Sequence, residues 1–220
     1  MAVVPEGKVT EGQSAYQRLR SAILEGELLP GQRLVEKDLA ERFGLGRAAI
    51  RTALARLEQE GLVESAPYRG AWVRILSEEE ALEVLEARMA LESLAARHAA
   101  RKATPEDIAR LQGILREMEG HYARGDLLAM SELNALFHRT LVEASRHRTA
   151  ARLIEALRAQ GVRHQYRTIL VPGRSQRSLE EHRRILEAVS ARDEEAAEQA
   201  MREHLQGVMA ALRQAKGGPA

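Results

Sequence analysis

The sequence contains no cysteine, which excludes disulfide scaffolds, cysteine-based zinc sites and thiol chemistry. Aromatic residues make up only 3% of the 220 residues and there are only 6 prolines, whereas hydrophobic residues make up 45%. The core must therefore be built from Leu, Ala, Val and Ile, and such a composition favours helices. No apolar run approaches the roughly 20 residues of a membrane span, and the first residues lack a signal peptide's apolar stretch. We therefore expect a cytoplasmic protein with no membrane association.

An excess of charge is also lacking, because 33 basic residues are matched by 32 acidic ones, for a formal net charge of +1. On gross charge alone the chain is not an obvious nucleic-acid binder. Residues 1–76 contain 11 basic and 10 acidic residues, and residues 77–220 contain 22 of each. A DNA-binding surface would therefore have to arise from the placement of a few arginines.

The pattern of the chain changes near Leu76 and Ser77, so we expect two domains, 1–76 and 77–220. In the first, glycine and proline interrupt short apolar segments. The periodicity predicts three helices and then two strands, over Ser14–Glu25, Glu36–Phe43, Arg47–Glu60, Leu62–Ser65 and Ala71–Ile75. Two short helices joined by a glycine-containing turn and followed by a hairpin are typical of a winged helix-turn-helix.

The second domain is predicted to be an all-α bundle of six helices, which makes the whole protein mainly α. Ser77 with Glu80 forms a capping box, and Thr104, Asp126 and Asp193 are further N-cap residues. The predicted helices run from Ser77 to about Arg101, from Thr104 to about Ala123, from Asp126 to about Ala144, over Thr149–Leu170, over Ser178–Ala191 and from Asp193 to about Gln214.

The predicted recognition helix begins with two arginines, Arg47 and Arg51, which project from one face because they are four residues apart. Such a helix fits the major groove of DNA, where arginine is the commonest reader of guanine. Arg56 and Arg69, which lies in the hairpin, would extend this basic surface. The same spacing also occurs on helix faces that merely meet solvent, so both interpretations stand at this point.

Four polar residues interrupt apolar helix faces in the second domain. Asn134 and His138 lie four residues apart in the helix after Asp126, and His182 and His204 lie in the last two helices. Inward polar groups need partners, and these four can share a divalent cation such as zinc or nickel. The alternative is a set of separate core histidines, each with its own hydrogen bonds.

Residues 19–73 carry a run of short motifs in order, including Ile23-Leu24-Glu25-Gly26, Leu29-Pro30-Gly31, Arg47, Arg51, Gly61-Leu62-Val63 and Arg69-Gly70-Ala71. This run resembles the GntR family of bacterial transcription regulators. The resemblance implies a homodimer that binds a palindromic operator in double-stranded DNA. The implied contacts are Lys37, Arg47, Arg51 and the wing tip Arg69-Gly70. Ala48 and Ala49 stand where the family usually has Thr or Pro, so the operator sequence is expected to differ from that of relatives.

The second domain resembles the FCD effector domain of FadR-type GntR regulators, in the six-helix, VanR-like branch. The motifs are EARMALESLAARHAA, NALFHRTL, EEHRRILEAV and DEEAAEQAMREHL. The resemblance implies metal ligands at Asn134, His138, His182 and His204. It also implies an effector site with Arg88, Asn134 and His138, to which we add Tyr166 as a wall residue. Arg88 would clamp a carboxylate of the effector, although it could also be only an exposed partner of Glu92.

Asn134 departs from this family pattern, in which an aspartate is common at that position. An amide oxygen is a neutral and weaker donor, so the full charge of a divalent cation would remain. We therefore expect weaker metal affinity, or a stronger requirement for an anionic effector.

The leading hypothesis is a ligand-responsive transcription regulator, most simply a repressor released by a small carboxylate, and not an enzyme. One alternative is an architectural DNA-binding dimer whose histidine cluster is only structural. The other is a metalloenzyme domain fused to a DNA-binding head, since three histidines and an open position also describe a catalytic zinc site.

Overall fold

The computed structural model describes residues 11–215, except for the side chains of residues 161–167. The chain divides between Leu76 and Ser77 into two compact units. Both are mainly helical over the described residues, with one small sheet in the first unit. No described helix combines the length and the apolar character that a membrane crossing requires.

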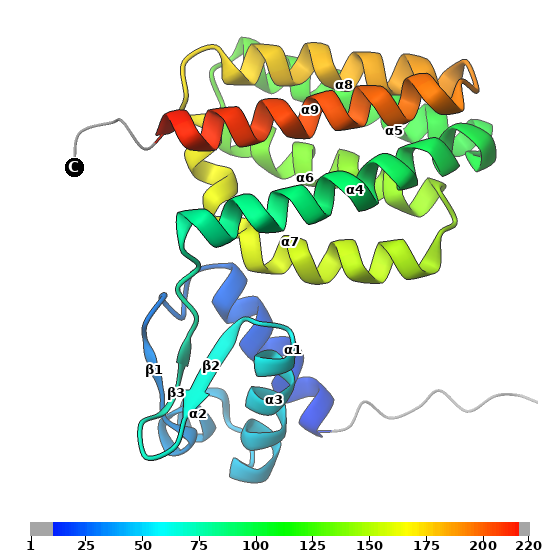
Figure 1. Ribbon diagram of the computed structural model, residues 1–220. Coiled ribbons are helices and arrows are strands. Elements are labelled where there is room, and N and C mark those ends of the chain that lie inside the picture. Colours follow the sequence, from blue (N-terminus) through cyan, green and yellow to red (C-terminus); the bar gives the residue numbers. More distant parts are fainter. Residues whose placement is uncertain (1–10, 216–220) are drawn as a thin grey trace, which may run out of the picture. The chain divides into compact units, whose positions relative to one another are not determined.

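The first unit has the winged helix-turn-helix arrangement that the sequence predicts (Figure 1). Its elements in chain order are α1 (Glu11–Leu24), β1 (Arg33–Leu34), α2 (Glu36–Phe43), α3 (Arg47–Gln59), β2 (Val63–Ala66) and β3 (Gly70–Val73). α2 ends at Gly44, which takes the left-handed φ of 62° that favours glycine. The chain then turns into α3, whose buried residues Ile50, Leu54 and Leu57 are packed into the unit's core.

The structure adds one strand to this unit and corrects three predicted element starts. β1 was not predicted, because a strand of two residues gives no alternating pattern; it pairs with β3 and completes an antiparallel sheet of order β1-β3-β2. α1 begins at Glu11 rather than at the predicted Ser14. β2 and β3 lie one residue away from the predicted strand starts at Leu62 and Ala71.

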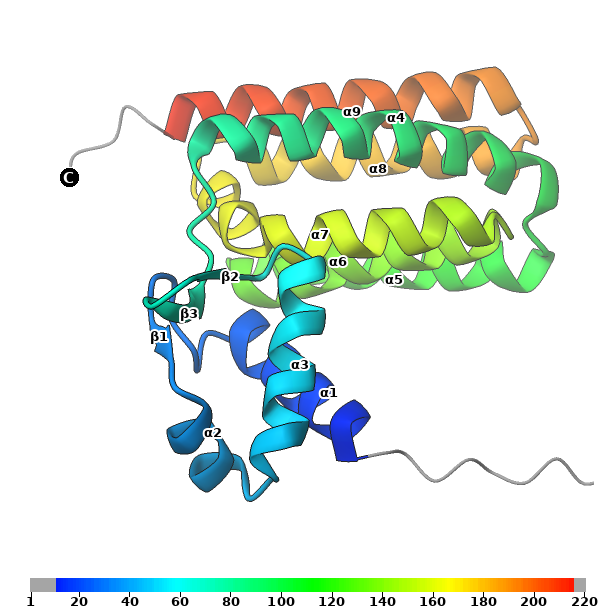
Figure 2. The same ribbon diagram turned by 60° about the horizontal axis from the view of Figure 1, so that its bottom comes forward.

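The second unit contains the six predicted helices, which lie alongside one another (Figures 1 and 2). They are α4 (Glu78–Lys102), α5 (Pro105–Ala123), α6 (Leu127–Ala144), α7 (Arg148–Ile169), α8 (Arg174–Ser190) and α9 (Glu194–Gln214). α4 packs against α9 and α7. The four predicted caps are confirmed: Ser77 and Thr104 form capping boxes, and Asp126 and Asp193 each accept a backbone N–H. The side chain of His147 caps α7 in the same way.

The start of α8 is wrong in the prediction, which placed it at Ser178. The helix begins at Arg174, after Gly173 at a φ of 73° and without a side-chain cap. No Ser or Asp marked this start, whereas Ser178 offered a plausible cap. As a result, Arg174 and Ser175 are buried helical residues rather than loop residues.

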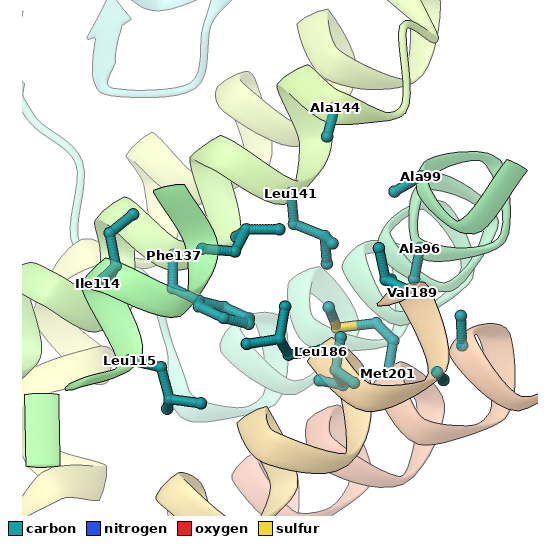
Figure 3. Close-up of a cluster of buried hydrophobic side chains, with 14 of the residues drawn as sticks. Ala96, Ala99, Ile114, Leu115, Phe137, Leu141, Ala144, Leu186, Val189 and Met201 are labelled. Atoms are coloured by element: carbon teal, nitrogen blue, oxygen red, sulfur yellow. The ribbon is translucent and has the colours of Figure 1, made fainter. Parts of the chain in front are cut away.

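The core of the second unit is built from small and medium-sized side chains around one aromatic ring (Figure 3). Phe137 is fully buried, and Leu141, Leu186 and Met201 belong to the same cluster. Alanines along α4, such as Ala96, let neighbouring helices approach closely. The core therefore follows the low aromatic content of the sequence, with methionines added to Leu, Ala, Val and Ile.

Truncation of Leu141 tests this core. Leu141 is fully buried, so Leu141→Ala is expected to lower the free energy of unfolding by about 2–5 kcal/mol. Leu128→Ala on the same helix is the control, because Leu128 is 61% exposed and should change stability by less than about 0.5 kcal/mol. Urea unfolding followed by circular dichroism measures both, and equal effects would contradict the assignment of this core.

Candidate functional site

Three histidines from three helices converge in the interior of the second unit. His138 lies on α6, His182 on α8 and His204 on α9, and all three are buried. The Nε2 atom of His138 lies 3.1 Å from that of His204 and 3.2 Å from that of His182. The apolar stripes of the sequence predicted that these residues face inward, and the fold brings them together at one point.

The other ring nitrogen of each histidine meets an oxygen atom. His204 Nδ1 lies 2.7 Å from a Glu181 carboxylate oxygen, and His182 Nδ1 lies 2.5 Å from the carbonyl oxygen of Ser178. His138 Nδ1 lies 2.9 Å from a Glu92 oxygen, a close polar contact that is not a well-formed hydrogen bond. Carbonyls and ionised carboxylates only accept hydrogen bonds, so the Nδ1 atoms carry the protons.

The three Nε2 atoms are therefore left with lone pairs that point at one another. Such a cluster is unfavourable by itself and favourable around a cation. Zn–N bonds of about 2.0–2.1 Å in a tetrahedral site place nitrogen ligands about 3.3 Å apart, which is close to the two Nε2 separations given above. Within the described part of the chain, these histidines form the one group of three or more His, Cys, Asp or Glu residues that could hold a metal ion.

Burial keeps the three imidazoles neutral, which is the form that binds metals. Burial lowers the pKa of His138 to about 3, against the opposing effect of Glu92. Burial and the two neighbouring imidazoles lower the pKa of His182 well below its ordinary value. Burial also lowers the pKa of His204, although Glu181 acts in the opposite direction.

Glu92 is a fully buried carboxylate that joins this cluster to two arginines. Arg88 Nε donates to it at 2.8 Å, and Arg158 NH2 donates at 2.7 Å from α7. Burial alone would raise the pKa of Glu92, but Arg158, Arg88 and His138 hold it well below the ordinary value. The Arg88–Glu92 pair, which the alternative interpretation of Arg88 placed on an exposed helix face, therefore exists, but it lies inside the protein.

A cavity with a volume of about 70 Å³ adjoins the histidines. Arg88, Asn134, His138 and His204 line it, together with mostly apolar side chains of α4 and α9. It has room for several water molecules or a small organic ligand. Asn134 is half-buried at its wall. The remaining predicted site residue, Tyr166, lies outside the residues whose side chains the structure describes.

Sequence reasoning missed Arg174, Glu181 and Arg158 as parts of this site. Arg174 is 4% exposed, lines the cavity, and holds Glu181 with both terminal nitrogens at 3.0 and 2.7 Å. Arg174 was missed because the predicted helix began at Ser178, which placed Arg174 in the preceding loop. Glu181 directly precedes His182 in the sequence, and that position beside an inward histidine was the available signal.

The predicted DNA contacts lie on the exposed part of the first unit. Arg47 and Ala48 are exposed at the start of α3, and Ala49 is partly exposed. Two Arg51 nitrogens donate to both carboxylate oxygens of Glu36, each at 2.8 Å. Gly46, the N-cap of α3, offers no side-chain cap.

The remaining basic residues of this surface differ in how closely other side chains contact them. Lys37 lies 3.9 Å from Glu41, and the guanidinium of the wing residue Arg69 lies 5.9 Å from the Trp72 ring centre, beside Gly70. Arg56 does not simply extend the basic surface, because its guanidinium stacks 3.6 Å from the ring centre of Tyr16.

Comparisons with known proteins agree with this architecture. The first unit is a winged helix-turn-helix of the kind found in transcription regulators. Residues 11–73 match the family described as "Bacterial regulatory proteins, gntR family", and residues 83–207 match the FCD domain. The chain therefore belongs to the GntR family and carries an FCD domain. It is a sequence-specific DNA-binding regulator of transcription rather than an enzyme.

Individual relatives match along most of the chain. The uncharacterized HTH-type transcriptional regulator YdhC of Bacillus subtilis is 32% identical, over 86% of this chain and 85% of YdhC. The HTH-type transcriptional repressor RspR of Escherichia coli is 31% identical, over 92% of this chain and 89% of RspR. The structure of E. coli McbR/YncC has a TM-score of 0.78 at 27% identity and covers 94% of this chain and 99% of that one.

The neutral histidines predict a loss of stability in mild acid. Between pH 7 and pH 5 the unfolded chain takes up protons on histidine with a pKa near 6.5, whereas folded His138 stays neutral down to about pH 3. The free energy of unfolding of the metal-free protein should therefore fall by up to about 2 kcal/mol because of His138 alone. The fall should be smaller in His138→Gln. Urea unfolding in EDTA at the two pH values measures it, and unchanged stability would contradict the neutral, buried state.

Proposed function

We propose that this chain is a homodimeric repressor that a small carboxylate, bound beside a metal ion in the FCD domain, releases from a palindromic operator. The observation that carries this proposal is the convergence of three buried Nε2 atoms at a cavity that Arg88 also lines. Repression is supported by the relative RspR, which is named a transcriptional repressor. Since chromosomal DNA is the partner, we place the protein in the bacterial cytoplasm.

His138, His182 and His204 would hold the metal, with zinc or nickel as the ions that suit imidazole ligands. Asn134 lies on the same cavity wall as His138 and is the fourth proposed ligand. When bound, the metal would supply a positive centre that attracts an anion. Because Asn134 is neutral where an aspartate would carry a charge, we propose weaker metal binding in the absence of an anionic effector.

Arg88 would bind a carboxylate of the effector. Its Nε is held by Glu92, which fixes the plane of the guanidinium. Among the described residues the terminal nitrogens of Arg88 have no hydrogen-bond partner, and they would donate to a ligand in a bidentate manner. Asn134 and His138 line the cavity beside it.

The first unit would read DNA with the start of α3 in the major groove. Arg47 and Arg51 would reach base edges or phosphates, Lys37 would contact the backbone, and Arg69-Gly70 at the wing would reach an adjacent groove. One recognition helix per chain requires two chains for a palindrome, which supports the homodimer. Effector binding would change operator affinity by a coupling energy of about 1–3 kcal/mol.

The test is operator binding with and without ligands in the FCD domain. An operator is selected from random duplexes, and fluorescence anisotropy then compares metal-free protein, zinc-loaded protein and zinc-loaded protein with small carboxylates. We expect a carboxylate to weaken specific binding about 5- to 100-fold. An operator affinity that changes with neither metal nor carboxylates would instead favour the architectural dimer with a structural histidine cluster.

Arg47→Ala tests the DNA-reading face. Removal of one positioned arginine should weaken operator binding by about 1–3 kcal/mol, because the lost contact is to a base or a phosphate. Arg56→Ala on the same helix removes an equal charge from a residue that stacks on Tyr16, so it is the matched control. Equal losses in the two variants, measured on the selected operator, would argue against Arg47 as a contact.

Gly207→Ala tests the support of His204. A Cβ at Gly207 would lie 2.9 Å from a Glu181 oxygen, and Glu181 is fixed by Arg174 and His204. Displacing such a support typically lowers metal affinity about 10- to 100-fold. Gly113→Ala is the control, because its Cβ would meet nothing within 4 Å. Competition with a zinc indicator measures both affinities, and an unchanged affinity in Gly207→Ala would contradict the role of Glu181.

A further inference from the structure

The cavity contains a second buried guanidinium, which the proposed carboxylate clamp does not use. Arg174 is the first residue of α8, is 4% exposed and lines the same cavity as Arg88 of α4. Its NH1 and NH2 atoms donate to the two oxygens of Glu181, so its plane is fixed. An arginine carries five N–H donors, and these bonds leave others for a ligand.

The charges around the cavity do not balance. Among the described side chains that line the cavity, contact its histidines or pair with the carboxylates that do so, Arg88, Arg158 and Arg174 are cationic, and Glu92 and Glu181 are anionic. The histidines are neutral. These described side chains together carry one excess positive charge, and a divalent cation on the histidines raises their excess to three.

Asn134 does not reduce this imbalance, because the side chain at the cavity wall beside His138 is a neutral amide. Buried charge is costly unless it is paired. A ligand with one carboxylate would leave two of the three positive charges unpaired, whereas a ligand with two carboxylates would leave one. The ligand therefore has to supply the negative charge that an acidic residue at position 134 would provide.

The positions of the two arginines favour two separate anionic groups over one. Arg88 comes from α4 and Arg174 from α8, and each is already held in place by its own carboxylate, Glu92 or Glu181. Guanidinium groups fixed in advance bind carboxylates with less loss of freedom. The hydroxyl of Ser175 and the amide of Asn134 add polar groups to the same walls.

We propose that the effector is a short dicarboxylate, with one carboxylate at Arg88 and the second at Arg174. This inference rests on the proposed function, in that it specifies the ligand of the same site. If Arg174 only positions Glu181 and His204, its removal will weaken metal binding and every carboxylate alike. If Arg174 recognises the ligand, its removal will affect dicarboxylates selectively.

The first test uses the zinc-loaded full-length protein and calorimetry. Malonate, succinate and glutarate are compared with propionate, butyrate, valerate and inorganic phosphate. We expect at least one dicarboxylate to bind about tenfold more tightly than the monocarboxylate of matching length and than phosphate. Equal affinity of mono- and dicarboxylates, or phosphate binding as tight as the best dicarboxylate, overturns the inference and leaves the carboxylate-responsive repressor intact. No binding by any carboxylate overturns both.

The second test compares Arg174→Gln with Arg177→Gln, an exposed arginine on the same helix. With zinc kept at a saturating concentration, Arg174→Gln should lose the preference for dicarboxylates while monocarboxylate affinity changes less than about twofold. Arg177→Gln should keep the preference. A parallel loss of zinc and of all carboxylates in Arg174→Gln would overturn the inference in favour of a positioning role. If Arg174→Gln does not fold, the ligand series on the unaltered protein still decides.

Discussion

The helical domain depends on the buried carboxylate of Glu92. It lies on α4 and receives Arg158 from α7, the imidazole of His138 from α6, and Arg88 from its own helix. Loss of this charge would leave two mostly buried guanidinium groups without their partner, which costs several kcal/mol in proteins generally. The carboxylate therefore fixes three helices relative to one another and, through His138, sets the direction of one Nε2 lone pair.

A similar arrangement recurs at Glu181. This carboxylate joins Arg174 to His204, as Glu92 joins Arg88 to His138. Two chains of guanidinium, carboxylate and imidazole thus lead from the cavity wall to the histidine cluster. An anion bound at either arginine would contact a guanidinium that is hydrogen-bonded to the carboxylate beside a histidine. Anion binding and cation binding are therefore physically linked through one set of side chains.

Much of the fold could be predicted because its signals are local. Capping residues such as Ser77 and Thr104 mark helix starts, and the apolar stripes turned His138, His182 and His204 inward. The supporting shell could not be predicted in this way, since Glu92 and Glu181 resemble ordinary surface acids until distant arginines cover them. Arg174 was missed for a different reason: a helix that begins after a left-handed glycine carries no capping signal.

The first unit gives a consequence of the ion pair between Arg51 and Glu36. Both guanidinium–carboxylate bonds are 2.8 Å long, so the arginine's charge is already largely neutralised before DNA arrives. A neutralised arginine displaces few counterions from a phosphate backbone. Association with the operator should therefore weaken with rising salt less steeply than the number of arginines on α3 suggests, and discrimination among sequences should persist at ionic strengths that abolish loose, sequence-independent binding.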